Sequence, residues 1–145
     1  MDRNRRQLLK ASGAVLAGAA VPARAADLMA TPAQMCGPFY PVTFPLDKDN
    51  DLVSIEGHAG IAYGEITNIA GQVLDEKGRP QAGVRIEIWQ VNGYGRYHHA
   101  GDDSDKPIDP HFQGYGTAVT NAQGRYRFRT VKPVAYPGRA PHIHF

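Results

Sequence analysis

Alternation of apolar and polar residues with a period of two is the feature that most constrains the fold of this chain. In the segment VRIEIWQV (84–91), Val84, Ile86 and Ile88 alternate with Arg85, Glu87 and Trp89, and RYRFRTV (125–131) alternates arginines with Tyr126, Phe128 and Thr130. Successive side chains of a strand point to opposite faces, so each segment predicts a strand, and the arginines predict a solvated face. Because no stretch with helical periodicity follows residue 25, we predict an all-β fold, an antiparallel β-sandwich.

Two further strands and two turns complete this pattern. The runs ITNIAGQVL (66–74) and GTAVT (116–120) are each followed by a segment rich in turn residues, DEKGRPQAG and NAQG. We therefore expect two strand–turn–strand hairpins. Residues 92–116 lie between them and form a long polar segment without apolar periodicity, and loops of that length in compact domains are usually functional or disordered.

The N-terminus predicts an export signal. Residues 1–25 combine a basic start containing Arg5 and Arg6, an apolar run over 11–21 and the A-x-A sequence at 23–25, and they resemble a twin-arginine signal peptide. The apolar run is too short to cross a bilayer about 30 Å thick. We expect a signal over 1–25, an irregular, extended N-terminal arm over 26–60 and a β-sandwich core over 61–145. The mature protein is then periplasmic or extracellular.

Charge and cysteine content exclude several classes of protein. Removal of residues 1–25 takes away five basic residues and one acidic residue, which changes the formal net charge from +2 to −2. A domain with that charge has no electrostatic basis for nucleic-acid binding, which needs clustered Lys and Arg. Cys36 is the single cysteine, so an intrachain disulfide is impossible. Packing or a metal must therefore stabilise the mature domain.

The C-terminal segment GRAPHIHF (138–145) contains a candidate metal site. His142 and His144 would share one face of an extended strand, with Cβ atoms roughly 6–7 Å apart. Two imidazoles so placed can reach one metal ion, although a His-x-His pair is equally compatible with the polar face of an edge strand. Tyr97 and Tyr136 add two phenols, and anionic phenolate oxygens favour ferric iron, a hard cation.

Four segments resemble the intradiol ring-cleavage dioxygenases, the family of protocatechuate and catechol dioxygenases. They cover most of the chain after Thr31 and read TPAQMCGPFYP, GQVLDEKGRPQAGVRIEIWQVNGYGRYHH, DPHFQGYGTAVTNAQGRYRFRTVKP and AYPGRAPHIHF. The resemblance implies a β-sandwich of transthyretin-like topology. It also implies a non-haem Fe(3+) site with Tyr97, Tyr136, His142 and His144 as ligands and Arg139 as a residue that assists catalysis.

The implied reaction opens a catechol-type ring with dioxygen and gives a cis,cis-muconate-type diacid. The resemblance further implies that Tyr136 leaves the metal when substrate binds and takes a substrate proton. Substrate and dioxygen are then the partners, without nucleic acid or, in the mature form, a membrane. The sequence leaves open the substituents of the catechol and whether the protein forms a homo-oligomer.

Other histidines and aromatic residues receive simpler interpretations. We expect His98 and His99 to lie in the loop near the metal, and His58 and His111 to be solvated. Trp89 is expected in the core, and Tyr40 either lines the pocket or packs in the core. We interpret three further tyrosines, Tyr94, Tyr115 and Tyr126, as packing or loop residues.

Two departures from the family pattern bear on the site. The segment between Tyr136 and His142 is short, which predicts an open substrate pocket. Family domains continue for several strands after H-I-H-F, so we expect this chain to be a fragment or to lack part of its sandwich, with uncertain activity on its own. Two alternative functions also stay open: a transthyretin-like binding or spacer module without catalysis, and a zinc hydrolase, which would need histidines plus a carboxylate.

Overall fold

The computed structural model describes residues 27–45 and 47–145, which form four β-strands and no helix. The strands are β1 (Ile66–Gln72), β2 (Arg85–Trp89), β3 (Tyr115–Val119) and β4 (Arg125–Val131). The predicted all-β fold is confirmed, whereas the predicted signal lies outside the described residues. Within the described ranges, no helix has the length and hydropathy needed to cross a membrane.

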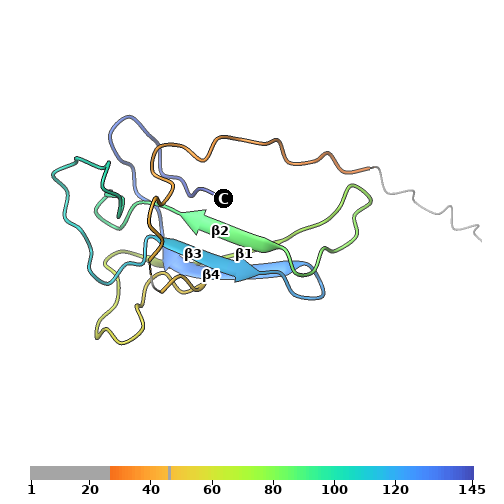
Figure 1. Ribbon diagram of the computed structural model, residues 1–145, viewed down its shortest axis with the longest axis horizontal. Coiled ribbons are helices and arrows are strands. Elements are labelled where there is room, and N and C mark those ends of the chain that lie inside the picture. The colour runs from red at the N-terminus through yellow and green to blue at the C-terminus, as the bar shows by residue number, and fades with distance from the viewer. Residues whose placement is uncertain (1–26, 46) are drawn as a thin grey trace, which may run out of the picture.

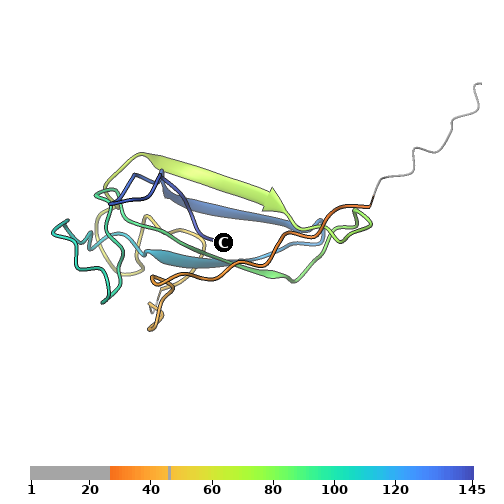
Figure 2. The same cartoon turned by 90° about the horizontal axis from the view of Figure 1, so that it is seen from above.

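The strands pair in two antiparallel sheets, β1 with β4 and β2 with β3 (Figure 1). Seen from above, the two pairs form two layers (Figure 2). Strands that follow one another along the chain therefore lie in different sheets, and the prediction of two hairpins is wrong. Just after β3, Thr120 N–H donates to Val84 O, so the chain still lies in the layer of β2 and β3. Four residues later, Gly124 O accepts the N–H of Val73, just after β1, so the chain there lies in the layer of β1 and β4. The chain thus crosses between the layers within residues 120–124.

One turn motif occurs three times, with Asn or Asp first and Gly-Arg at the fourth and fifth positions. In the example that begins at Asn121, its Oδ1 accepts the N–H groups of Gln123 and Arg125, each at 3.0 Å. Gly124 has a φ of +70°, and a Cβ there would lie 2.5 Å from the Val73 carbonyl oxygen, so only glycine fits. The other two examples begin at Asp75 and Asn92.

A segment N-terminal to the strands runs beside β4 and joins the two sheets. Arg129 N–H donates to Asn50 O and Leu52 N–H donates to Arg129 O, both at 2.8 Å. On the other sheet, Thr117 N–H donates to Lys48 O at 2.9 Å. Residues 48–52 therefore fill the gap between β4 and β3.

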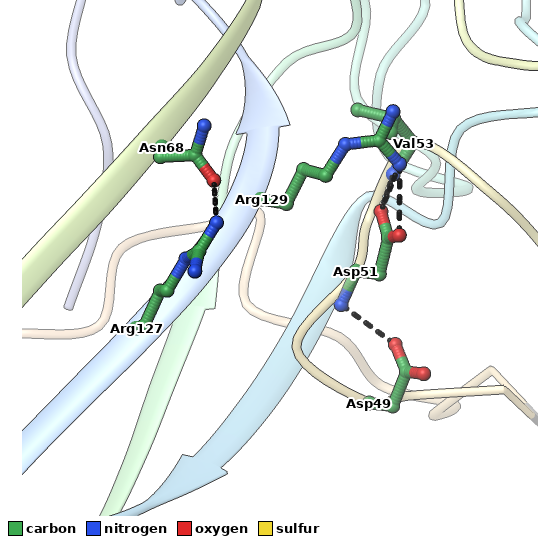
Figure 3. A network of polar contacts seen from close by, with 6 residues as sticks. All are labelled: Asp49, Asp51, Val53, Asn68, Arg127 and Arg129. Carbon is green, nitrogen blue, oxygen red and sulfur yellow. Dashed lines mark hydrogen bonds and ion pairs between the residues drawn. The ribbon is translucent and has the colours of Figure 1, made fainter.

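The exposed side of β4 carries the predicted arginine face. Arg125 and Arg127 are exposed, while Arg129 is half-buried and forms an ion pair with Asp51 at 2.8 Å (Figure 3). Arg127 donates to Asn68 Oδ1 on β1 at 2.9 Å. The prediction of a solvated face is confirmed at the first two positions, and the third arginine anchors the segment beside β4.

The two faces of β2 contribute to two different apolar clusters. Ile88 is fully buried between the sheets, in a cluster that also contains Leu52, Val53, Ala62, Phe112, Phe128 and Val131. Trp89, on the opposite face, packs with Val91, Tyr97 and Tyr115. This second cluster is aromatic and includes Tyr97, one of the predicted ligands. The core prediction for Trp89 is confirmed.

Candidate metal centre

Four side-chain donor atoms converge at one end of the aromatic cluster. Tyr97 Oη lies 3.0 Å from His144 Nε2 and 3.5 Å from Tyr136 Oη. His142 Nε2 lies 3.4 Å from Tyr136 Oη and 3.2 Å from His144 Nε2. The four predicted ligands are thus brought together, with each donor atom next to two others.

This spacing fits a single bound metal ion. A metal about 2.0–2.1 Å from four tetrahedral donors holds them about 3.3 Å apart. The four measured distances of 3.0–3.5 Å bracket that value. Across the described residues, no group of three or more His, Cys, Asp or Glu side chains is placed to bind a metal. The donors are therefore two phenols and two imidazoles, which suits a hard trivalent cation better than zinc.

The two histidines are held by different contacts. His142 Nδ1 lies 2.6 Å from the carbonyl oxygen of Ala140, so this nitrogen carries a proton for the bond and Nε2 is left to bind a metal. His144 is paired with Trp89 of β2 through its backbone. The segment that carries both histidines thereby lies against the edge of β2 (Figure 1).

The turn that begins at Asn92 positions Tyr97. Asn92 Oδ1 accepts the N–H groups of Tyr94 at 2.9 Å and Arg96 at 3.1 Å, and Nδ2 donates to Pro107 O at 2.9 Å. Asp102 Oδ2 then accepts the N–H of Tyr97 itself at 2.7 Å. The long polar loop is therefore ordered around the backbone of one candidate ligand.

Burial sets the protonation state of the site. Tyr97 is 3% exposed, and desolvation, followed by its hydrogen bond to Tyr136, raises the pKa of its phenol far above 10. Desolvation also lowers the pKa of His144, with the neighbouring charges of His142 and Arg139 acting in the same direction. Without a cation the protein holds a neutral phenol, so ionisation of Tyr97 near pH 7 requires a bound metal.

A cavity of about 870 Å³ opens beside the donors. One wall is the arm between Pro32 and Phe39, and the other contains Tyr136, Arg139, His142 and His144. Arg139 is exposed, and no ion pair joins it to a described carboxylate. The cavity therefore offers one free guanidinium to a bound ligand.

The remaining predicted residues lie around this cavity or away from it. Tyr40 is half-buried, packs against the aromatic cluster and donates to Glu87 Oε2 at 2.6 Å, and it does not line this cavity. His98 is exposed, and His99 packs edge-on against Phe39 at 5.7 Å. His58 is exposed as expected, but His111 is half-buried because its ring covers Gly60.

Sequence reasoning missed two aromatic contacts to the donors. Phe39 stacks on Tyr97 with ring centroids 4.4 Å apart, and Trp89 stacks on His144 at 4.9 Å. Each contact joins segments about 55 residues apart in the chain. The one sequence signal for Phe39 was its place in the GPFY segment of the arm, which is part of a stretch that resembles the family.

Comparison with known proteins decides the family. Residues 35–143, most of the chain, match the family model described as Dioxygenase. The chain belongs to the intradiol ring-cleavage dioxygenase family. It is 46% identical over 104 residues to the protocatechuate 3,4-dioxygenase beta chain of Burkholderia cepacia and 36% identical over 108 residues to the hydroxyquinol 1,2-dioxygenase of Rhizobium sp..

Solved structures of intradiol dioxygenases share the fold. The dioxygenase domain of a Streptomyces sp. SirexAA-E fusion protein superposes with a TM-score of 0.60 at 31% identity, covering 79% of this chain and 63% of that one. An intradiol ring-cleavage dioxygenase from Tetranychus urticae gives 0.52 at 29% identity, covering 70% and 52%. Family membership favours an enzyme over a spacer module.

This chain spans less than half of the two curated relatives. The matches cover 67% of the chain and 44% of the Burkholderia protein, and 74% of the chain and 34% of the Rhizobium protein. The family-model match, over residues 35–143, contains the candidate donors Tyr97, Tyr136 and His142.

Proposed function

We propose that this protein is a non-haem ferric-iron dioxygenase that opens a catechol-type ring between its two hydroxylated carbons. Dioxygen is the second substrate, and both of its atoms enter a cis,cis-muconate-type diacid, so the reaction consumes no other reductant. The observation that carries the proposal is the convergence of Tyr97, Tyr136, His142 and His144 within 3.0–3.5 Å along the four measured edges.

The four donors divide into a fixed set and one mobile member. Ferric iron, when bound, supplies a Lewis acid that activates the catecholate toward dioxygen. Tyr97 is buried against Phe39, whereas Tyr136 is half-buried and lines the cavity, so of the two phenols Tyr136 is the one with room to move. As the family resemblance implies, Tyr136 would leave the metal as a phenolate when substrate enters, and its Oη would then accept a proton from the catechol.

Arg139 supplies positive charge to the reacting ring. Its guanidinium lines the cavity, and it cannot lose its proton or act as a ligand because it has no free lone pair. A positive charge close to anionic charge that develops in the transition state accelerates the reaction more than it strengthens substrate binding. This residue is thus the second catalytic group, beside Tyr136.

Dioxygen incorporation tests the proposal. The iron-loaded protein is incubated with catechol and ¹⁸O₂, and the product is analysed by mass spectrometry. A diacid that carries two labelled oxygen atoms is expected. A quinone, or a product without label, would contradict ring opening by a dioxygenase. Protocatechuate and hydroxyquinol, the substrates in the relatives' names, serve as alternative substrates.

We also propose that residues 1–25 direct export by the twin-arginine route. The support is the Arg5-Arg6 pair followed by an apolar run and A-x-A. Replacement of both arginines by lysine should leave the protein in the cytoplasmic fraction. Unchanged export of that variant would refute the proposal.

A further inference from the structure

Trp89 and His144 face each other as a doubly hydrogen-bonded antiparallel pair. Trp89 N–H donates to His144 O at 3.3 Å, and His144 N–H donates to Trp89 O at 3.0 Å. Directly opposite residues of such a pair place their side chains on the same face. The indole and the imidazole are accordingly parallel, with an interplanar angle of 4° and centroids 4.9 Å apart.

His144 lacks the usual orienting hydrogen bond of a metal-binding histidine. Such histidines generally donate their second ring N–H to a carbonyl, carboxylate or water. His142 has this contact with the carbonyl oxygen of Ala140. By contrast, no described residue hydrogen-bonds to His144 Nδ1, and both of its polar side-chain contacts use Nε2. Among the described residues, only a contact other than a hydrogen bond is placed to set the angle of the His144 ring.

The indole is itself held firmly by packing. Trp89 is 4% exposed, and its Nε1 has no hydrogen-bond partner among the described residues. The ring of Tyr40 meets it edge-on, with centroids 4.9 Å apart and an interplanar angle of 85°. Tyr40 is in turn fixed by its 2.6 Å hydrogen bond to Glu87, which is two residues before Trp89 on β2.

We propose that Trp89 is a positioning residue for the metal site, whose backbone and indole face together hold the His144 ring at the angle required for ligation. This inference rests on the proposed function, since it concerns a ligand of the proposed iron site. A flat aromatic ring at position 89 is the property that matters, so phenylalanine should substitute in part and leucine should not. Loss of a group that orients a metal ligand typically weakens metal binding by about 10- to 100-fold.

The first measurement needs no metal. In the NMR spectrum of the metal-free full chain, ring protons of His144, assigned by their absence in His144→Ala, should lie upfield because they sit over the indole. The shift should decrease in Trp89→Phe and vanish in Trp89→Leu. An unshifted His144 signal in the parent protein overturns the proposal whether or not any variant folds.

The second measurement is the rate at which a chelator removes ferric iron, followed by loss of visible absorption. Trp89→Leu should release iron about 10- to 100-fold faster than the parent, and the rate of Trp89→Phe should lie between those of the parent and Trp89→Leu. Val91→Ala is the control, because Val91 is 1% exposed in the same cluster and is not part of the stack. Equal release by the parent, Trp89→Leu and Val91→Ala proteins would refute the role of Trp89.

The two measurements separate this inference from the proposed function. A parent protein that shows the upfield His144 signal but never binds ferric iron would refute the iron enzyme and support the stack. A parent that binds iron without the upfield signal would refute the stack alone.

Discussion

At the scale of single residues, the site depends on which side chains hold a donor atom and which only lie nearby. Tyr97 Oη is 3.0 Å from His144 Nε2, whereas His99 packs against Phe39 and accepts the N–H of Gly101. We expect Tyr97→Phe to lose iron and visible colour together, and His99→Ala to retain both. Iron analysis and absorption spectra of the purified variants test this. Equal losses in the two variants would show that the ligand assignment is wrong.

Arg139 should affect the reaction without affecting the metal. We expect Arg139→Ala to keep iron content and catechol affinity, while turnover falls by about 10² to 10³, the usual loss for one preorganised donor. Stopped-flow mixing of the anaerobic catechol complex with oxygen measures the step directly. Reaction of the variant at the parent rate would limit Arg139 to a surface role, where an exposed arginine contributes under about 1 kcal/mol to stability.

At the scale of elements, the turn motif that recurs through the chain has a special role at Asn92. This residue is buried and organises the loop that carries Tyr97. Asn92→Ala leaves two backbone N–H groups and one carbonyl without their partner, so we expect a loss of about 1–3 kcal/mol in stability and faster iron release.

Asn121→Ala is the matched control for this loop. It removes the same pair of turn hydrogen bonds in the turn between β3 and β4. That turn lies at the opposite end of the strands from the loop that follows β2 (Figure 1, Figure 2). Denaturant unfolding should show a loss of stability there too, without any change in iron release. Identical iron release from both asparagine variants would mean that the Asn92 turn does not position Tyr97.

The Tyr40–Glu87 contact should make the stability of the β2 edge depend on pH. The hydrogen bond from Tyr40 lowers the pKa of Glu87 below 4.5 in the folded protein, against the opposing effect of burial. A lowered folded pKa stabilises the fold above the unfolded value, and that contribution disappears as the pH falls through the folded pKa. The stability difference between the parent and Tyr40→Phe should thus be full at pH 7 and decrease below pH 4.5. A difference that stays constant down to pH 2 would contradict this linkage.

At the scale of the whole molecule, local sequence patterns predicted the strands but not their partners. The alternation in 84–91 and 125–131 depends only on neighbours along the chain, and β2 and β4 form there. Pairing of β1 with β4 joins residues about 60 positions apart, so it depends on how the layers pack. The hairpin prediction failed because a tight turn such as 121–124 can also carry the chain from one sheet to the other.

For the candidate site as well, features set by neighbouring residues were predictable, whereas contacts between distant segments were not. The spacing of His142 and His144 predicted a shared face from local geometry, whereas the tyrosines were assigned through resemblance to a family. The stacks of Phe39 on Tyr97 and of Trp89 on His144 join distant segments. Trp89 was interpreted as an ordinary core residue, and no local pattern placed Phe39 beside Tyr97. The pattern Asn-x-x-Gly-Arg, with Gly three residues after Asn, is visible in the sequence. It would have predicted the turn that orders the loop before Tyr97.

Titration of the purified protein with ferric iron, followed by visible absorption, tests the central claim most directly. Tyrosine phenolates bound to ferric iron absorb visible light, and two of the four converging donors are phenols. We predict that colour develops in proportion to added iron and saturates at one ferric ion per chain. A protein that stays colourless with ferric iron bound, or that binds none, would contradict the account.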